Sequence, residues 1–110
     1  MRLLILWLLL ALSPVAGAQE PDVEQAKALY TNGKMLFDEG RFEEAIIAWN
    51  KAFEISERPL LLFNIALAQE ELGRYTEAIE TLYKYRIYAP KDEQGAMVAK
   101  IEELKGLQAA

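Results

Sequence analysis

The chain contains an internal repeat with a period of 33 residues. The segment from Gly40 to Ile46, GRFEEAI, returns from Gly73 to Ile79 as GRYTEAI. Five of the seven positions are identical, and the exchange of Phe42 for Tyr75 keeps an aromatic ring. A repeat of this length is typical of helical units that stack on one another, because one unit cannot bury its apolar face alone. The sequence therefore predicts a small array of helices.

Apolar residues recur at helical spacing throughout the chain after Glu20, and no segment shows the two-residue alternation of a half-buried strand. Gly40 and Gly73 are placed where helices should end in a left-handed residue. Pro59 and Pro90 lie near the first position of the next helix, where a missing N–H costs no hydrogen bond. We predict helices over residues 22–38, 42–56, 59–72, 75–88 and 91–107.

The first eighteen residues form a distinct apolar segment. Arg2 precedes ten apolar residues, Leu3 to Leu12, and Ala16-Gly17-Ala18 has the small-x-small pattern of a cleavage site. This organisation predicts a secretory signal peptide over residues 1–18 that is cut after Ala18. The alternative is an uncleaved membrane anchor. However, a ten-residue helix spans only about 15 Å of the roughly 30 Å hydrocarbon layer.

Composition narrows the expected location and partners. The chain has no cysteine, so it lacks the residue that bacterial lipoprotein anchoring requires. We therefore expect a periplasmic or secreted protein with no stable membrane insertion after cleavage. The remaining 92 residues, from Gln19 to Ala110, carry a formal charge of −6. This acidity argues against binding to nucleic acid and to anionic membrane surfaces.

Residue types that commonly carry catalysis are scarce. The chain has no histidine and no cysteine, and Ser56 is the only serine after the predicted signal peptide. Adjacent carboxylates such as Glu43 and Glu44 diverge by about 100° on a helix, so they do not form a paired site. No spacing typical of an EF-hand calcium site is present. We predict a protein that is not an enzyme and that has no catalytic residues, metal or cofactor.

The repeats resemble those of the tetratricopeptide repeat family. The closing stretch YKYRIYAP, residues 83–90, is also similar to that of small envelope-associated bacterial members. Two positions depart from the family pattern: Pro59 falls two positions late, and Tyr85 stands where alanine is usual. The positions that carry the resemblance are Leu29, Asn32-Gly33, Leu36, Ala45 and Trp49 in the first unit, and Leu62, Ile65-Ala66, Gln69, Ala78, Leu82 and Pro90 in the second.

This resemblance implies an all-α fold of antiparallel helix-turn-helix repeats arranged as a right-handed solenoid. The two repeats are expected at residues 22–56 and 59–89, with a capping helix at 91–108. Gly33, Ala45 and Ala78 are small residues expected at close helix contacts, because helix axes 8–10 Å apart leave no room for long side chains.

The resemblance also implies a function, which is to bind a protein or peptide partner in a concave groove lined by the first helix of each unit. Asn64 is expected to hydrogen-bond an extended peptide, since the family often uses an asparagine at this place. The alternative for the groove aromatics is simple packing against neighbouring helices. The expected groove residues are Tyr30, Lys34, Phe37, Phe63, Asn64, Leu67 and Glu71.

A second hypothesis is a self-associating structural module of a cell-envelope assembly. Three repeats are usually needed for stability, and this chain has two with one further helix. An exposed end of the array around Tyr83, Ile87 and Tyr88 would then pair with a second copy, giving a homo-oligomer.

Overall fold

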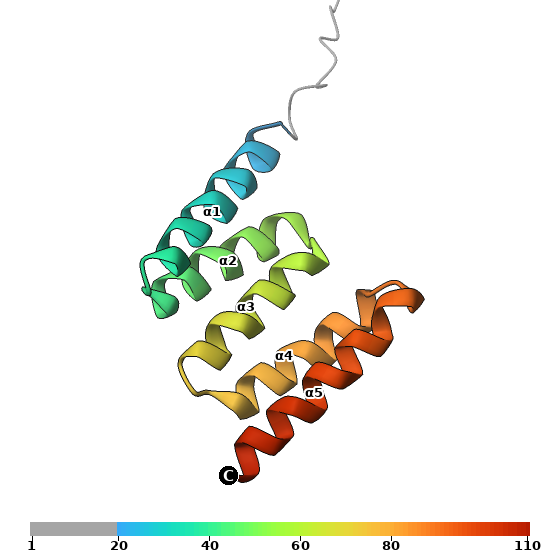
Figure 1. The fold of residues 1–110 in the computed structure, drawn as a ribbon. Helices are drawn as coiled ribbons and strands as arrows, with labels where there is room; N and C mark the ends of the chain where they lie inside the picture. Colours follow the sequence, from blue (N-terminus) through green and yellow to red (C-terminus); the bar gives the residue numbers. More distant parts are fainter. Residues whose placement is uncertain (1–19) are drawn as a thin grey trace, which may run out of the picture.

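The computed structural model describes residues 20–110, and Figure 1 shows its helices following one another as an array. The described residues contain no strand, which confirms the all-α fold. The predicted signal peptide, residues 1–18, lies outside them. Between residues 20 and 110, no helix combines the length and apolarity needed to cross a membrane. The helices are α1 (Glu20–Asp38), α2 (Phe42–Ser56), α3 (Pro59–Glu71), α4 (Tyr75–Tyr88), the short 3-10 helix η1 (Lys91–Glu93) and α5 (Gln94–Ala109).

Helix limits agree with the predicted ones to within a few residues. The limits of α2 and α4 are as predicted, α1 begins two residues earlier, and α3 ends one residue earlier. The largest difference follows Pro90, where η1 intervenes and α5 begins only at Gln94. Ala89 is extended, with ψ of 139°, because a residue that precedes proline disfavours helical geometry. The chain therefore has to start a new helix after this proline.

Both copies of the Gly-Arg pair form the same tight turn. Gly40 and Gly73 have φ angles of +77° and +73°, in the left-handed region that glycine adopts without steric cost. The N–H of Gly40 donates to the carbonyl oxygen of Phe37 at 2.9 Å, and the N–H of Arg41 donates to that of Leu36 at 2.8 Å. The second copy makes the equivalent pair of bonds. This pattern closes one helix while the next begins, so the two helices of each unit are antiparallel.

The arginines of the two turns bind different neighbours. Arg41 pairs with Glu44 of its own unit, whereas Arg74 of the second unit pairs with Glu43 of the first. These ion pairs raise the pKa values of both guanidinium groups. All of these side chains are largely exposed, so solvent screens the pairs. The pair between Arg74 and Glu43 joins the two units at the surface.

The contact between α1 and α2 is built around Trp49. A Cβ atom added at Gly33 would lie 2.7 Å from Cε2 of Trp49 and closer still to Nε1, so only a bare backbone fits there. Nε1 of Trp49 donates a hydrogen bond to the carbonyl oxygen of Tyr30 at 3.1 Å. Ala45 and Ala52 are fully buried in the same cluster. The close helix contact expected from the small residues is therefore confirmed.

A second apolar cluster joins α3, α4 and α5. Ala78 and Leu82 of α4 and Leu104 of α5 are buried in it. At its edge, Nζ of Lys100 lies 2.9 Å from Oε2 of Glu70, which ties α5 to α3. This hydrogen-bonded ion pair raises the pKa of Lys100. Figure 1 shows α5 lying along α4 at the end of the array. Ile101 and Leu104 of α5 share the apolar cluster with Ala78 and Leu82, so α5 covers the apolar face of the second unit.

Tyr85 links the second unit to the 3-10 helix that follows it. Its ring lies with its centroid 5.9 Å from that of Phe63, and its hydroxyl donates a hydrogen bond to Oε2 of Glu93 at 3.1 Å. Burial raises the pKa of Tyr85, and the bond to Glu93 adds to this effect. The tyrosine thus connects α3, α4 and η1 at a position where an alanine was the residue to expect.

We predict that Gly33→Ala destabilises the protein. Alanine favours a helix over glycine by up to about 1 kcal/mol, but the new methyl group overlaps the indole of Trp49. That ring is buried and held by its bond to Tyr30, so overpacking at about 1–3 kcal/mol should dominate. Chemical denaturation should show a net loss of about 1 kcal/mol in the free energy of unfolding.

Gly106→Ala is the matched control, because a Cβ at this position of α5 meets no atom within 4 Å. Its free energy of unfolding should stay unchanged or rise. Equal stability of Gly33→Ala and wild type would contradict the packing described here.

We predict that wild type has a higher free energy of unfolding than Tyr85→Phe and that this difference becomes smaller at high pH. The raised pKa means that the native state keeps the phenol neutral after the unfolded chain has begun to ionise, near pH 10. The unfolded state then binds fewer protons, so stability falls as pH rises through this range. At pH 8 the lost hydrogen bond should cost about 1 kcal/mol. Denaturation curves at pH 8 and above pH 10 measure the difference, and a constant difference would contradict the buried, hydrogen-bonded phenol.

Candidate functional site

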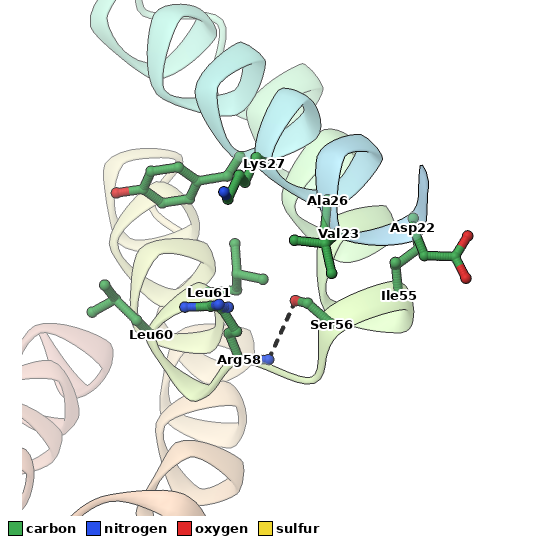
Figure 2. A pocket seen from close by; sticks show the side chains of 10 residues that line it. Asp22, Val23, Ala26, Lys27, Ile55, Ser56, Arg58, Leu60 and Leu61 are labelled. Atoms are coloured by element: carbon green, nitrogen blue, oxygen red, sulfur yellow. Dashed lines mark hydrogen bonds between the residues drawn. The ribbon is translucent and has the colours of Figure 1, made fainter. Parts of the chain in front are cut away.

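A cleft opens between the first half of α1 and the start of α3. Its volume is about 640 Å³, and the turn from α2 to α3 borders it at one end, as Figure 2 shows. α1 and α3 run in the same direction on this side of the array. The cleft is lined by Asp22, Val23, Ala26, Lys27 and Tyr30 of α1, by Ile55 and Ser56 of α2, and by Arg58, Leu60 and Leu61 at the start of α3.

The cleft has a buried apolar floor and exposed apolar walls. Ala26 and Leu61 are 7% and 3% exposed, so they belong to the packed interior. Val23 and Leu60, from the two opposite helices, are 45% and 55% exposed. Exposed aliphatic side chains on both sides of one opening give it an apolar surface.

The turn that borders the cleft is held by a network around Ser56. The hydroxyl of Ser56 donates to the carbonyl oxygen of Ala52 at 2.8 Å and accepts the N–H of Arg58 at 3.4 Å. Between them, Glu57 adopts a φ of +51°, a left-handed conformation that is uncommon outside glycine. Pro59 then starts α3, as predicted. The network fixes the direction in which α3 leaves the turn and therefore the width of the opening.

Three of the sequence-predicted groove residues are aromatic, and the structure places them differently. Tyr30 lines the cleft, and its carbonyl oxygen holds the indole of Trp49. The ring of Phe37 packs 5.8 Å from that of Trp49, at the core of the first unit. The ring of Phe63 packs against Tyr85 and the second apolar cluster. Phe37 and Phe63 thus make the contacts with neighbouring helices that the alternative interpretation describes.

The remaining four predicted residues do not line the cleft. Lys34 and Glu71 are exposed, and Asn64 and Leu67 are half-buried on α3. Helical periodicity predicts which side of a helix faces a neighbour, but it does not predict where along its length the neighbour diverges. Of the predicted groove residues, Tyr30 therefore lines the cleft, and the other six lie outside it.

Sequence reasoning missed the other residues of α1 that line the cleft. Val23, Ala26, Lys27 and Tyr30 have the spacing i, i+3, i+4 and i+7, which places them on one helical stripe. Extending the stripe backwards from Tyr30 would have found them. On α3, no sequence pattern marks Leu60 as a cleft residue. Leu60 and Leu61 are adjacent leucines, and only the folded structure shows that the first is exposed and the second is buried.

The cleft combines aliphatic side chains with a lysine, an arginine and an aspartate. Across residues 20–110, no cluster of three or more histidine, cysteine, aspartate or glutamate side chains has the geometry to hold a metal ion. The raised pKa values of Tyr85 on α4 and Lys100 on α5 arise outside the cleft. A second hollow, of about 230 Å³, lies between α1 and α2 and is more open.

Comparison with known families agrees with this architecture. The tetratricopeptide repeat family model matches residues 26–59 and 60–85, which span most of α1 to α4 and leave α5 outside. Together these matches cover more than half of the chain. A comparison with curated proteins gave no match. Tetratricopeptide repeats form protein–protein interaction modules, and the 33-residue period, the paired turns and the helix packing agree with that family. The chain belongs to the tetratricopeptide repeat family.

Proposed function

We propose that the protein is an adaptor that holds a protein or peptide partner in the cleft between α1 and α3. The observation that carries this proposal is the pair of exposed aliphatic walls, Val23 and Leu60, above a buried floor. Small clefts with apolar walls and a few polar groups are the usual form of binding sites. The family supports a protein as the occupant, since its repeats serve as interaction modules.

The adaptor acts in the periplasm or outside the cell. The support for this part of the proposal is the predicted signal peptide of residues 1–18 and the absence of a cysteine for lipid attachment. Cleavage after Ala18 leaves residues 19–110, which contain all five α-helices and the 3-10 helix that the structure describes, together with both apolar clusters.

The protein is not an enzyme and uses no cofactor in this proposal. Histidine and cysteine are absent from the sequence, which removes the most common general base and the thiol nucleophile. The hydroxyl of Ser56 is engaged with the carbonyl oxygen of Ala52, where it stabilises the turn. The residues that line the cleft thus support binding rather than turnover.

We predict that Leu60→Glu removes partner binding without unfolding the chain. Leu60 is 55% exposed, so a carboxylate there remains solvated in the free protein but is buried against the partner in the complex. Residues 19–110 should retain a specific protein from an envelope or secreted extract, and the variant should bind that protein at least about tenfold more weakly.

Met35→Glu is the matched control for this experiment. Met35 lies on α1 and is 58% exposed, close to the exposure of Leu60 on α3, but it does not line the cleft. Both variants should keep the wild-type helicity. If Leu60→Glu retains the partner as well as Met35→Glu does, the cleft is not the binding site.

The second candidate function is self-association through α4. Ile87 is 80% exposed, the highest value among the exposed large apolar residues of the described chain, and Tyr83 and Tyr88 beside it are 43% and 52% exposed. Tyr83 and Ile87 lie one helical turn apart and give a surface that a second copy can cover. The ring of Tyr88 lies beside that of Phe53, with centroids 6.4 Å apart, at the edge of this surface.

We predict for this candidate that residues 19–110 form dimers and that Ile87→Asp restores the monomer, because a buried carboxylate disfavours the apolar interface. Sedimentation at several protein concentrations measures the mass. A monomer mass that is independent of concentration would exclude self-association and leave the adaptor.

A further inference from the structure

We infer that the cleft selects a segment of the partner protein in which an aliphatic side chain is flanked by carboxylates. This inference rests on the proposed function, because it specifies the chemistry of the partner that the adaptor holds. Three features of the cleft support it: two cationic side chains, the weakness of their ion pairs within the described chain, and the apolar walls of the opening.

The two cations reach the cleft from different elements. Lys27 belongs to α1, and Arg58 is the residue directly before α3. Figure 2 draws both side chains among those that line the opening. A ligand whose aliphatic group lies between the exposed Val23 and Leu60 would therefore have positive charges within reach.

Within residues 22–110, these cations have no strong partner. Arg58 forms no ion pair there, in contrast to Arg41 and Arg74, which bind glutamates. In the same range Lys27 pairs only with Glu24, at 3.8 Å, and both side chains are about two-thirds or more exposed. Such a pair contributes little and is easily exchanged for a carboxylate of the ligand.

The charge at the cleft is opposite to that of the whole chain. The sequence has a formal net charge of −5, whereas the described residues that line the cleft include two cations, Lys27 and Arg58, and one acid, Asp22. An acidic segment is repelled by most of this protein and attracted at this opening. Arginine also binds a carboxylate through two parallel N–H donors, which gives Arg58 a geometric preference for aspartate or glutamate.

The apolar walls determine the central part of the ligand. Val23 and Leu60 expose aliphatic surface on opposite sides of the opening, and the buried Leu61 lies between the two helices that carry them. An aliphatic side chain on this surface removes apolar area from water on both sides. A wholly polar acidic segment leaves those walls exposed to water, so we expect it to bind more weakly than a segment that also carries an aliphatic side chain.

The inference is tested with three fluorescein-labelled peptide probes and residues 19–110. The first probe has two leucines flanked by aspartate and glutamate, the second replaces every acid by lysine, and the third replaces the leucines by serine. Both peptide ends are blocked, so that a terminal carboxylate cannot account for binding. Fluorescence anisotropy should give a Kd in the micromolar range for the first probe and values at least about tenfold weaker for the other two.

Charge-reversed variants identify the cations that make the selection. In the double variant Lys27→Glu with Arg58→Glu, the order of the acidic and lysine probes should be reversed. The double variant Lys84→Glu with Arg86→Glu makes the same change of net charge at exposed residues of α4 outside the cleft, and it should keep the wild-type order. Raising the salt concentration should reduce the preference, because the charges are partly exposed.

Several results would overturn the inference. These are equal binding of the acidic and lysine probes, no binding of the acidic probe at about 1 mM, or an equal effect of the two double variants. Competition by a second copy of the chain for the same cleft would also overturn it, since the occupant would then be the chain itself. If Leu60→Glu still loses its captured partner while the probes show no preference, the adaptor function stands and only this ligand chemistry fails.

Discussion

The indole of Trp49 lies on the bare backbone of Gly33, and the rest of the array depends on this contact. The ring fills the space that a side chain at Gly33 would need, and its N–H is bonded to the carbonyl oxygen of Tyr30. The contact fixes both the distance between α1 and α2 and their rotation about their own axes. Because the same carbonyl belongs to a residue that lines the cleft, the packing of the first unit also determines where Tyr30 stands in the candidate site.

The two ends of the helices have separate roles. The two Gly-Arg turns lie at the same end of the paired helices, where glycines with positive φ close α1 and α3. The turn from α2 to α3 lies at the opposite end of these helices. There the chain uses Ser56 and a left-handed Glu57 instead of glycine. The repeated sequence therefore builds the regular end, and the candidate binding site lies at the end where the repeat is not kept. The partner preference inferred from Arg58 arises from this less regular turn.

The end of the array is closed by side chains outside the repeat pattern. α5 buries Leu104 against α4, and Lys100 reaches Glu70 on α3. Tyr85 occupies the room between α3 and η1, where a small residue would leave a gap or allow a closer approach. A chain of only two units thus covers its last apolar face with a helix of its own.

The sequence by itself determined the five α-helices, the positions of the Gly-Arg turns and the small residues of the close contacts, but not the 3-10 helix after Pro90. These features follow from local rules: helical periodicity, the need for glycine at positive φ, and the missing volume at Gly33 and Ala45. It also predicted Tyr30 as a groove residue, and the structure places Tyr30 at the candidate cleft. Only the tertiary structure decided which predicted groove residues line this cleft. Phe37 and Phe63 have the periodicity of a groove, but the neighbouring rings of Trp49 and Tyr85 occupy their faces. The location of the cleft depends on where α1 and α3 diverge, and this is set by the sum of long-range packing contacts rather than by any local pattern.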